Sequence, residues 1–196
     1  MTSSSPRRAG GGRTVRKAQK SNTALLIGGG VLVLLIAAVA IFQLTRNTVT
    51  NVGENIPDLG QNLHLQTPND PLPVPYNSDP PTSGYHWGGG IGPWGVQTKP
   101  ISDTITVHNL EHGGVMIHYS PSLDPATIAQ LSDLTRDLQR QNPCIILAPR
   151  PGLANPITVT AWTYMLKLDT YQAATIQAFF KARVGRGPEA VCRPLS

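Results

Sequence analysis

An unbroken apolar segment at positions 24–42 constrains this chain more than any other feature of its sequence. A helix over that segment would cover roughly 28 Å, close to the ~30 Å hydrocarbon core of a bilayer. The segment is longer than the apolar region of a signal peptide, which has about 7–15 residues, and its A-x-A pattern at 38–40 lies inside it. We therefore predict an uncleaved transmembrane helix over 23–44, with a cleaved signal peptide as the alternative.

The residues before this segment include six basic side chains and no acidic one. Because Lys and Arg beside a membrane helix stay on the cytoplasmic side, we predict a basic cytoplasmic arm over 1–22 and an extracytoplasmic remainder. The rest of the chain carries ten Lys and Arg against eleven Asp and Glu, so the net charge of +5 belongs to the arm. Topology and contact with anionic lipid explain such an arm, and we expect the bilayer rather than nucleic acid as its partner. The basic residues are Arg7, Arg8, Arg13, Arg16, Lys17 and Lys20.

The outer part is long enough for one domain with a single core. We predict a spacer over 45–70 and an extracytoplasmic domain over 71–196, which opens with a Pro/Gly-rich loop rich in aromatic residues. Cys144 and Cys192 would lie in an oxidising compartment, where a disulfide between them is expected. Two separate thiols are the alternative.

The hydrophobic pattern of the domain predicts strands followed by helices, twice over. Alternation indicates strands, and apolar residues every three or four positions indicate helices. Asp124 followed by Pro125 is typical of a helix start. The predicted fold is α+β: a small, mainly antiparallel sheet with two helices on one face. The predicted strands are 104–108, 115–119, 144–148 and a β-rich stretch over 157–168, and the predicted helices are 124–140 and 170–184.

Histidines cluster between His86 and His118, and this cluster is the main functional signal. Strand alternation places His108 and His118 on the face away from the predicted helices, where the loop that carries His86 can cover them. Imidazole and carboxylate are ligands of zinc and copper. We therefore predict a metal site formed by His86, His108 and His112, completed or oriented by His118 or Glu111.

Other interpretations of the cluster stay open at this stage. The histidines and Glu111 can be purely structural, with the carboxylate bound to a backbone amide or to Arg150, or they can form a metal-free acid–base or ligand-binding site. Positions 108–112 also match the H-x-x-E-H pattern of one metalloprotease class, which requires a helix. The β-rich run before the pattern and the two glycines after it argue against a helix. His64, in the predicted spacer, is expected to be exposed.

Two segments resemble a known bacterial family. They are N-S-D-P-P-T-S-G at 77–84 followed by His86, and H-N-L-E-H-G-G at 108–114. They are similar to the family catalogued as domain of unknown function 3105, which implies one membrane helix, an extracytoplasmic domain and no established reaction. Together these observations predict a membrane-anchored domain with a His/Glu site for zinc or copper. The alternative is a non-catalytic interaction module or accessory subunit that binds a membrane-protein partner.

Overall fold

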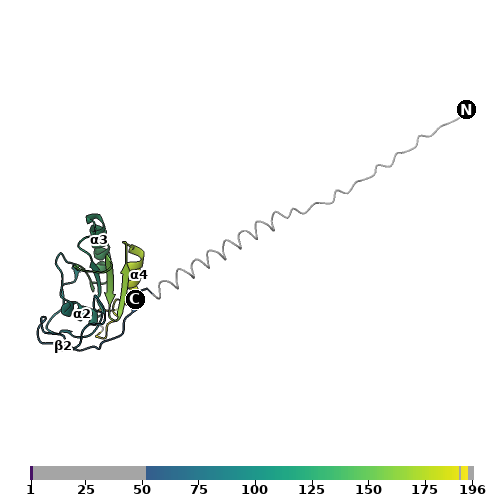
Figure 1. Ribbon diagram of the computed structural model, residues 1–196. Helices are drawn as coiled ribbons and strands as arrows, with labels where there is room; N and C mark the ends of the chain where they lie inside the picture. The colour runs from purple at the N-terminus through teal and green to yellow at the C-terminus, as the bar shows by residue number, and fades with distance from the viewer. Residues whose placement is uncertain (2–51, 190, 194–196) are drawn as a thin grey trace. The chain divides into compact units, whose positions relative to one another are not determined.

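The computed structural model describes residues 52–189 and 191–193, together with Met1. Within these residues, none of the helices combines the length and the apolar character that crossing a bilayer requires. The basic arm and the apolar segment at 24–42 lie outside the described residues and are drawn as a grey trace in Figure 1. The membrane helix therefore stays a prediction from sequence.

A six-stranded sheet forms the centre of the domain, in the order β1-β8-β7-β5-β6-β4 (Figure 1). The pairs β1–β8, β8–β7 and β7–β5 are antiparallel, whereas β5–β6 and β6–β4 are parallel. The sheet is therefore mixed, with antiparallel pairing along one half. Its strands are β1 (Glu54–Asn55), β4 (Gly95–Val96), β5 (Val115–Tyr119), β6 (Ile145–Pro149), β7 (Ile157–Ala161) and β8 (Tyr164–Leu168).

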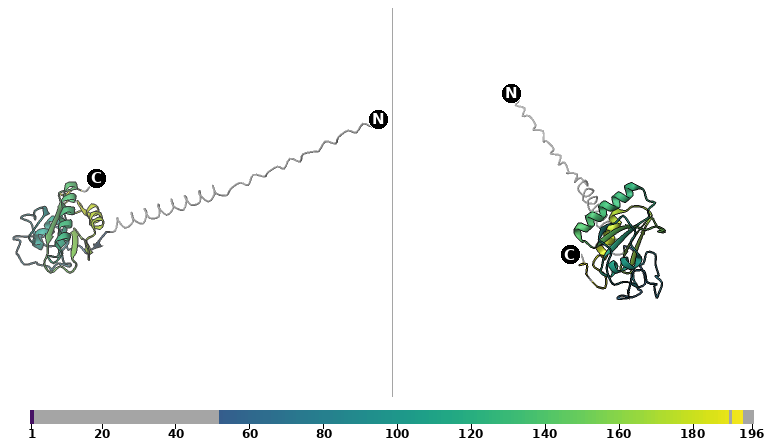
Figure 2. Two further views of the ribbon diagram at one scale, coloured as in Figure 1. Left: turned by 90° about the horizontal axis from the view of Figure 1, so that it is seen from above. Right: turned by 90° about the vertical axis from the view of Figure 1, so that its left-hand side faces the viewer.

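Two helices, α3 (Pro125–Gln141) and α4 (Ala173–Arg183), cover one face of this sheet, as the sequence predicted (Figures 1 and 2). Asp124 accepts a hydrogen bond from the backbone N–H of Thr127 at 2.9 Å and so caps α3, with Pro125 in its first turn. Leu131, Phe179 and Phe180 are fully buried against the strands. The α+β class is thus confirmed, and apolar burial is the main force that holds this layer together.

A third helix, α2 (Asp103–Glu111), covers the other face, and here the strand predicted over 104–108 was wrong. The β-branched residues at 104–107 favour a strand by propensity, which is only a weak preference. As a helix, the segment places Val107 and Leu110 on one side, where both are buried with Met116 of β5. Tertiary packing therefore decides the local structure of this segment.

The segment predicted as a spacer, 45–70, is part of the fold wherever the structure describes it. Strand β1 pairs with β8, and β2 (His64–Leu65) pairs in parallel with β3 (His86–Trp87) as a separate two-stranded sheet. Leu65 and Val52 are buried. Residues within 52–70 therefore pair and pack with the rest of the domain.

The predicted bond between Cys144 and Cys192 is confirmed, with sulfurs 2.02 Å apart. It attaches the C-terminal segment to the start of β6. The backbone N–H of Cys192 donates to the carbonyl of His112, just after α2, at 2.8 Å. The disulfide therefore holds the C-terminal segment against the end of α2, beside His112.

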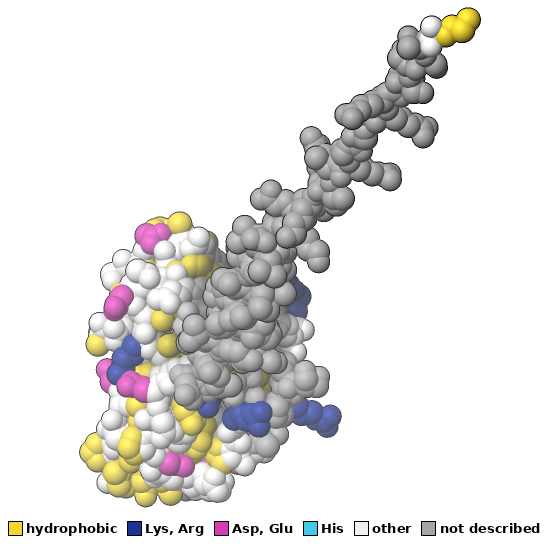
Figure 3. All heavy atoms as spheres, turned by 90° about the vertical axis from the view of Figure 1, so that its right-hand side faces the viewer, with side chains coloured by type: hydrophobic (Ala, Val, Ile, Leu, Met, Phe, Trp, Pro, Cys, Tyr) yellow, Lys and Arg dark blue, Asp and Glu magenta, His cyan; other side chains and the backbone are white. Residues whose placement is uncertain are grey.

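The surface of the domain carries both signs of charge. Figure 3 shows one face, on which acidic and basic side chains lie among apolar and uncharged polar ones. This distribution agrees with the nearly equal numbers of acidic and basic residues outside the arm.

Candidate metal centre

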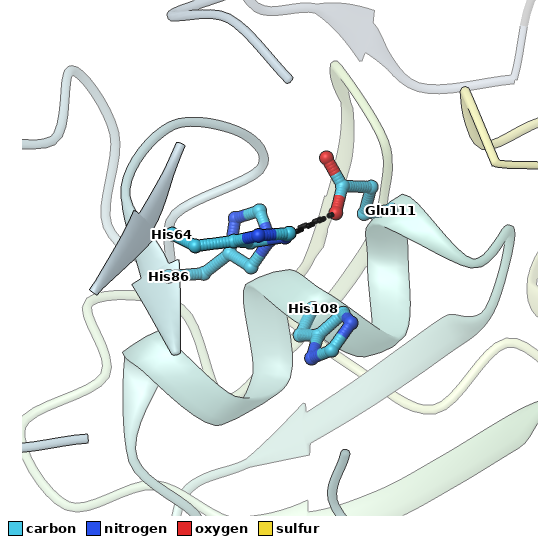
Figure 4. A group of neighbouring side chains, drawn as sticks. All are labelled: His64, His86, His108 and Glu111. Carbon is cyan, nitrogen blue, oxygen red and sulfur yellow. Dashed lines mark ion pairs between the residues drawn. The ribbon is translucent and has the colours of Figure 1, made fainter. Parts of the chain in front are cut away.

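Four side chains from three elements converge between α2 and the two-stranded sheet β2–β3 (Figure 4). His64 and His86 are register partners in the parallel pair β2–β3. His108 and Glu111 lie three residues apart on α2 and therefore share one helix face. Two strands and one helix thus bring together residues that are up to 47 positions apart in the sequence.

The four residues are close enough to bind one ion. Each offers one ligand atom, and these atoms all lie within 4.8 Å of one another. The carboxylate Oε2 of Glu111 is 2.8 Å from Nε2 of His86 and 3.7 Å from Nε2 of His64. The side chains of His86 and Glu111 are fully buried, whereas that of His64 is 44% exposed. The group is therefore buried, with one edge open to solvent.

Backbone carbonyls fix the orientation of two of the imidazoles. Nδ1 of His86 lies 2.8 Å from the carbonyl oxygen of Gly84, and Nδ1 of His108 lies 3.1 Å from that of Gly90. A carbonyl only accepts, so both Nδ1 atoms carry the proton and donate, and each Nε2 keeps its lone pair. Histidines that ligate metals through Nε2 are held in this way.

The contact between His86 and Glu111 brings two buried acceptor atoms together. The lone pair of Nε2 on His86 faces a carboxylate oxygen, and both atoms are buried with no hydrogen-bond partner among the described residues. Burial lowers the pKa of His86, although its hydrogen bond to Gly84 and the charge of Glu111 oppose this. Burial disfavours a second proton on the ring, and the two facing atoms are of the types that ligate a divalent metal ion.

The other oxygen of Glu111 is held by the backbone. The N–H of Asn62, a residue in the left-handed region at φ 57°, donates to Oε1 at 2.6 Å. This contact fixes the carboxylate so that Oε2 points at the histidines. The sequence had also suggested an ion pair with Arg150, but that guanidinium binds Asp79 and Asp103 instead.

The glycine-rich segment after β3 encloses the group. A Cβ atom on Gly88 would lie 2.8 Å from Cγ of His64, so a side chain at this position would displace the ring. Asn109 holds Gly92 by two hydrogen bonds, accepting from its N–H at 2.7 Å and donating to its carbonyl at 3.0 Å. The glycines therefore allow a backbone approach that other residues would block.

His112, a predicted ligand, follows α2 and belongs to a second group with His108 and Glu189. Its Nε2 is 2.8 Å from Oε2 of Glu189, and its ring centroid is 4.5 Å from that of His108. Because α2 extends through Glu111, the sequence argument against a helix at the H-x-x-E-H pattern was wrong. The two histidines of the pattern lie together with Glu189, whereas Glu111 faces His64 and His86.

His118, the remaining predicted ligand, lies outside both groups. It is buried on β5, on the same face of the sheet as α2, with Nε2 3.1 Å from the hydroxyl of Thr160 on β7. Burial, together with the nearby charge of Arg150, lowers the pKa of His118 to about 3. This histidine is therefore a neutral core residue in the fold.

Sequence reasoning missed His64 and Glu189. His64 was expected to be exposed in a spacer, and it is exposed, but strand pairing places it beside His86. Glu189 is brought to His112 by the C-terminal segment, where its backbone N–H donates to the carbonyl of Glu111 at 3.1 Å. Both placements depend on long-range pairing, which no local pattern signals.

The fold and the site define an α+β domain with a buried His/Glu cluster that has the ligand types of a divalent metal site. The chain belongs to the family described as "Protein of unknown function (DUF3105)", whose model matches residues 69–194. The matched residues include every member of the two groups of possible metal ligands except His64. No curated protein and no solved structure matches the chain.

Proposed function

We propose that this protein is a single-pass membrane protein whose extracytoplasmic domain binds one zinc or copper ion through His64, His86, His108 and Glu111. The observation that carries the proposal is the close approach of two buried acceptors, Nε2 of His86 and Oε2 of Glu111, at 2.8 Å. A metal ion bound to both atoms would offset their repulsion and satisfy both lone pairs.

The ligand types favour a divalent ion of borderline softness. Three imidazoles and one carboxylate suit Zn²⁺ or Cu²⁺, whereas Cu⁺ prefers thiolate and thioether ligands. Both cysteines of the chain are in the disulfide, so neither offers a thiolate. The carbonyls of Gly84 and Gly90 hold the rings for ligation through Nε2, and the exposed edge at His64 leaves room for a water or an exchangeable ligand.

The membrane location in this proposal is supported by the sequence. The apolar segment at 24–42 has the length of a membrane span, and the basic residues before it favour a cytoplasmic N-terminus. The disulfide agrees with an oxidising compartment for the domain. The bilayer is therefore the partner that we propose for the N-terminal part.

The test is metal content of the full chain, extracted from membranes with a mild detergent and purified without a polyhistidine tag. After incubation with zinc or copper and removal of excess ion, mass spectrometry should find one ion per chain. His108→Ala should lose the ion, whereas His118→Gln, a change at a buried histidine outside the cluster, should keep it. Membranes washed with high salt before extraction should retain the protein if it is anchored.

A metal-free wild-type chain that keeps its fold and takes up neither ion would refute the metal site. Full binding by His86→Ala, His108→Ala and Glu111→Gln alike would refute the assignment of these residues as ligands. Circular dichroism of each variant distinguishes loss of the site from loss of the fold.

A further inference from the structure

A second group of three possible ligands includes His108, which also belongs to the proposed metal site. Its other members are His112 and Glu189, and the three ligand atoms lie within 4.8 Å of one another. The side chains of His112 and Glu189 are 18% and 32% exposed, whereas those of His86 and Glu111 are fully buried. This group is therefore closer to solvent than the buried pair of the first site.

The shared histidine can serve only one of the two groups at a time. Nδ1 of His108 carries its proton and donates to the carbonyl of Gly90, so the ring has one lone pair, on Nε2. One lone pair ligates one ion. The two groups are therefore alternative positions for a single ion rather than a two-ion centre.

The second group is also the weaker of the two. Nδ1 of His112 is buried without a hydrogen-bond partner in the described part of the chain, whereas Nδ1 of His86 is held by Gly84. Loss of such an outer contact typically lowers metal affinity about 10- to 100-fold. An ion at equilibrium should therefore occupy the buried ligands, and the second group should hold it only in passing.

We propose that His108, His112 and Glu189 form a transient outer position through which the ion enters and leaves the buried site. This inference rests on the proposed metal site and adds its loading route. The ion keeps its bond to Nε2 of His108 while Glu189 and His112 are replaced by Glu111 and His86. One carboxylate and one imidazole are exchanged for the same two ligand types, and His64 adds an imidazole to the buried set, so the number of carboxylates around the ion does not change.

The C-terminal segment keeps the outer position in place. The backbone N–H of Glu189 donates to the backbone carbonyl of Glu111 at 3.1 Å, and that of Cys192 donates to the backbone carbonyl of His112 at 2.8 Å. These contacts use the backbone, so the carboxylate of Glu189 can be changed without removing them. His64 offers a second opening to solvent, since its side chain is 44% exposed, and the experiment must separate the two routes.

The experiment measures the rate and the equilibrium of zinc transfer to the metal-free full chain in detergent. Zinc is supplied from a chromophoric chelator, and absorbance follows its release in a stopped-flow instrument. Glu189→Gln should still bind one zinc with nearly unchanged affinity, but transfer should slow by about tenfold or more, because the outer position loses its charged ligand. The matched control is Glu54→Gln, a half-exposed carboxylate that pairs with Lys167 on the surface, which should behave as wild type.

The outcomes distinguish failure of the loading route from failure of the metal site itself. One zinc per wild-type chain with an unchanged transfer rate in Glu189→Gln would overturn the loading route, assign entry to the His64 side and leave the metal site standing. Two zinc ions per wild-type chain, or loss of zinc at equilibrium in Glu189→Gln, would overturn the single-ion, two-position arrangement. A wild-type chain that takes no zinc or copper would overturn both proposals.

Discussion

The two faces of the sheet are covered in different ways. Helices α3 and α4 cover one face with a continuous apolar layer that includes Leu131, Phe179 and Phe180. Helix α2 and the glycine-rich segment cover the other, where apolar Leu110 lies beside buried polar groups such as Glu111. Burying polar groups costs free energy unless each finds a partner. The first face therefore provides stability, and the second combines stability with a site.

The largest expected effect comes from removing apolar volume on each face. Phe179→Ala, at a fully buried side chain, should lower the free energy of unfolding by about 3–5 kcal/mol, and Leu110→Ala by about 2–5 kcal/mol. Only Leu110→Ala should also weaken zinc binding, because α2 carries His108 and Glu111. Urea unfolding followed by tryptophan fluorescence and zinc titration measure the two quantities.

Val74→Ala is the control for this pair, since Val74 is 48% exposed and its truncation should change neither quantity measurably. Equal loss of zinc affinity in Phe179→Ala and Leu110→Ala would contradict the division of roles between the faces.

A smaller effect is expected from the disulfide, which connects the C-terminal segment to the face that carries the site. Replacing Cys144 and Cys192 together by Ser should cost about 2–4 kcal/mol of unfolding free energy, because the bond closes a long loop in the unfolded chain. Urea unfolding of this variant, compared with wild type in the presence and absence of reductant, measures the change. A reductant effect of similar size in the double Ser variant would show that the disulfide is not its source.

The last effect, which is the smallest near neutral pH, is a pH dependence that originates in His118, on the face of the sheet that α2 covers. Its folded pKa is about 3, against about 6.5 in an unfolded chain, so between these values only the unfolded state binds the proton. The free energy of unfolding should therefore be unaffected by this group above pH 6.5, and should fall below it by about 1.4 kcal/mol per pH unit. His118→Gln should reduce this slope in urea unfolding of the metal-free protein between pH 7.5 and 4.5. Parallel pH profiles for wild type and variant would assign the dependence to other groups.

Local signals in the sequence were sufficient to predict the helices that form the apolar layer, α3 and α4. Asp124 and Pro125 marked the start of α3, and leucines at helical spacing marked its buried face. The cysteine pair and the strands β5 to β8 also followed from composition and pattern. These features depend on neighbouring residues, or on a pairing with only one possible partner.

The site was predicted only in part, because its geometry depends on contacts between distant segments. The histidine cluster identified His86, His108 and Glu111, which the structure brings together, and His118, which it does not. The β-branched residues before His108 indicated a strand, although burial against β5 stabilises a helix. His64 carried no local signal, since only its pairing with β3 places it beside His86.

The sequence by itself determined the α+β class, the membrane-span prediction, the disulfide partners and the ligand types available for chemistry. Local propensity, periodicity and composition are enough for these features. The tertiary structure decided that α2 is a helix, that residues 52–70 belong to the domain, and that His108 lies between two ligand groups. The physical reason is that free energy from long-range burial and strand pairing exceeds the weak local preferences of a short segment.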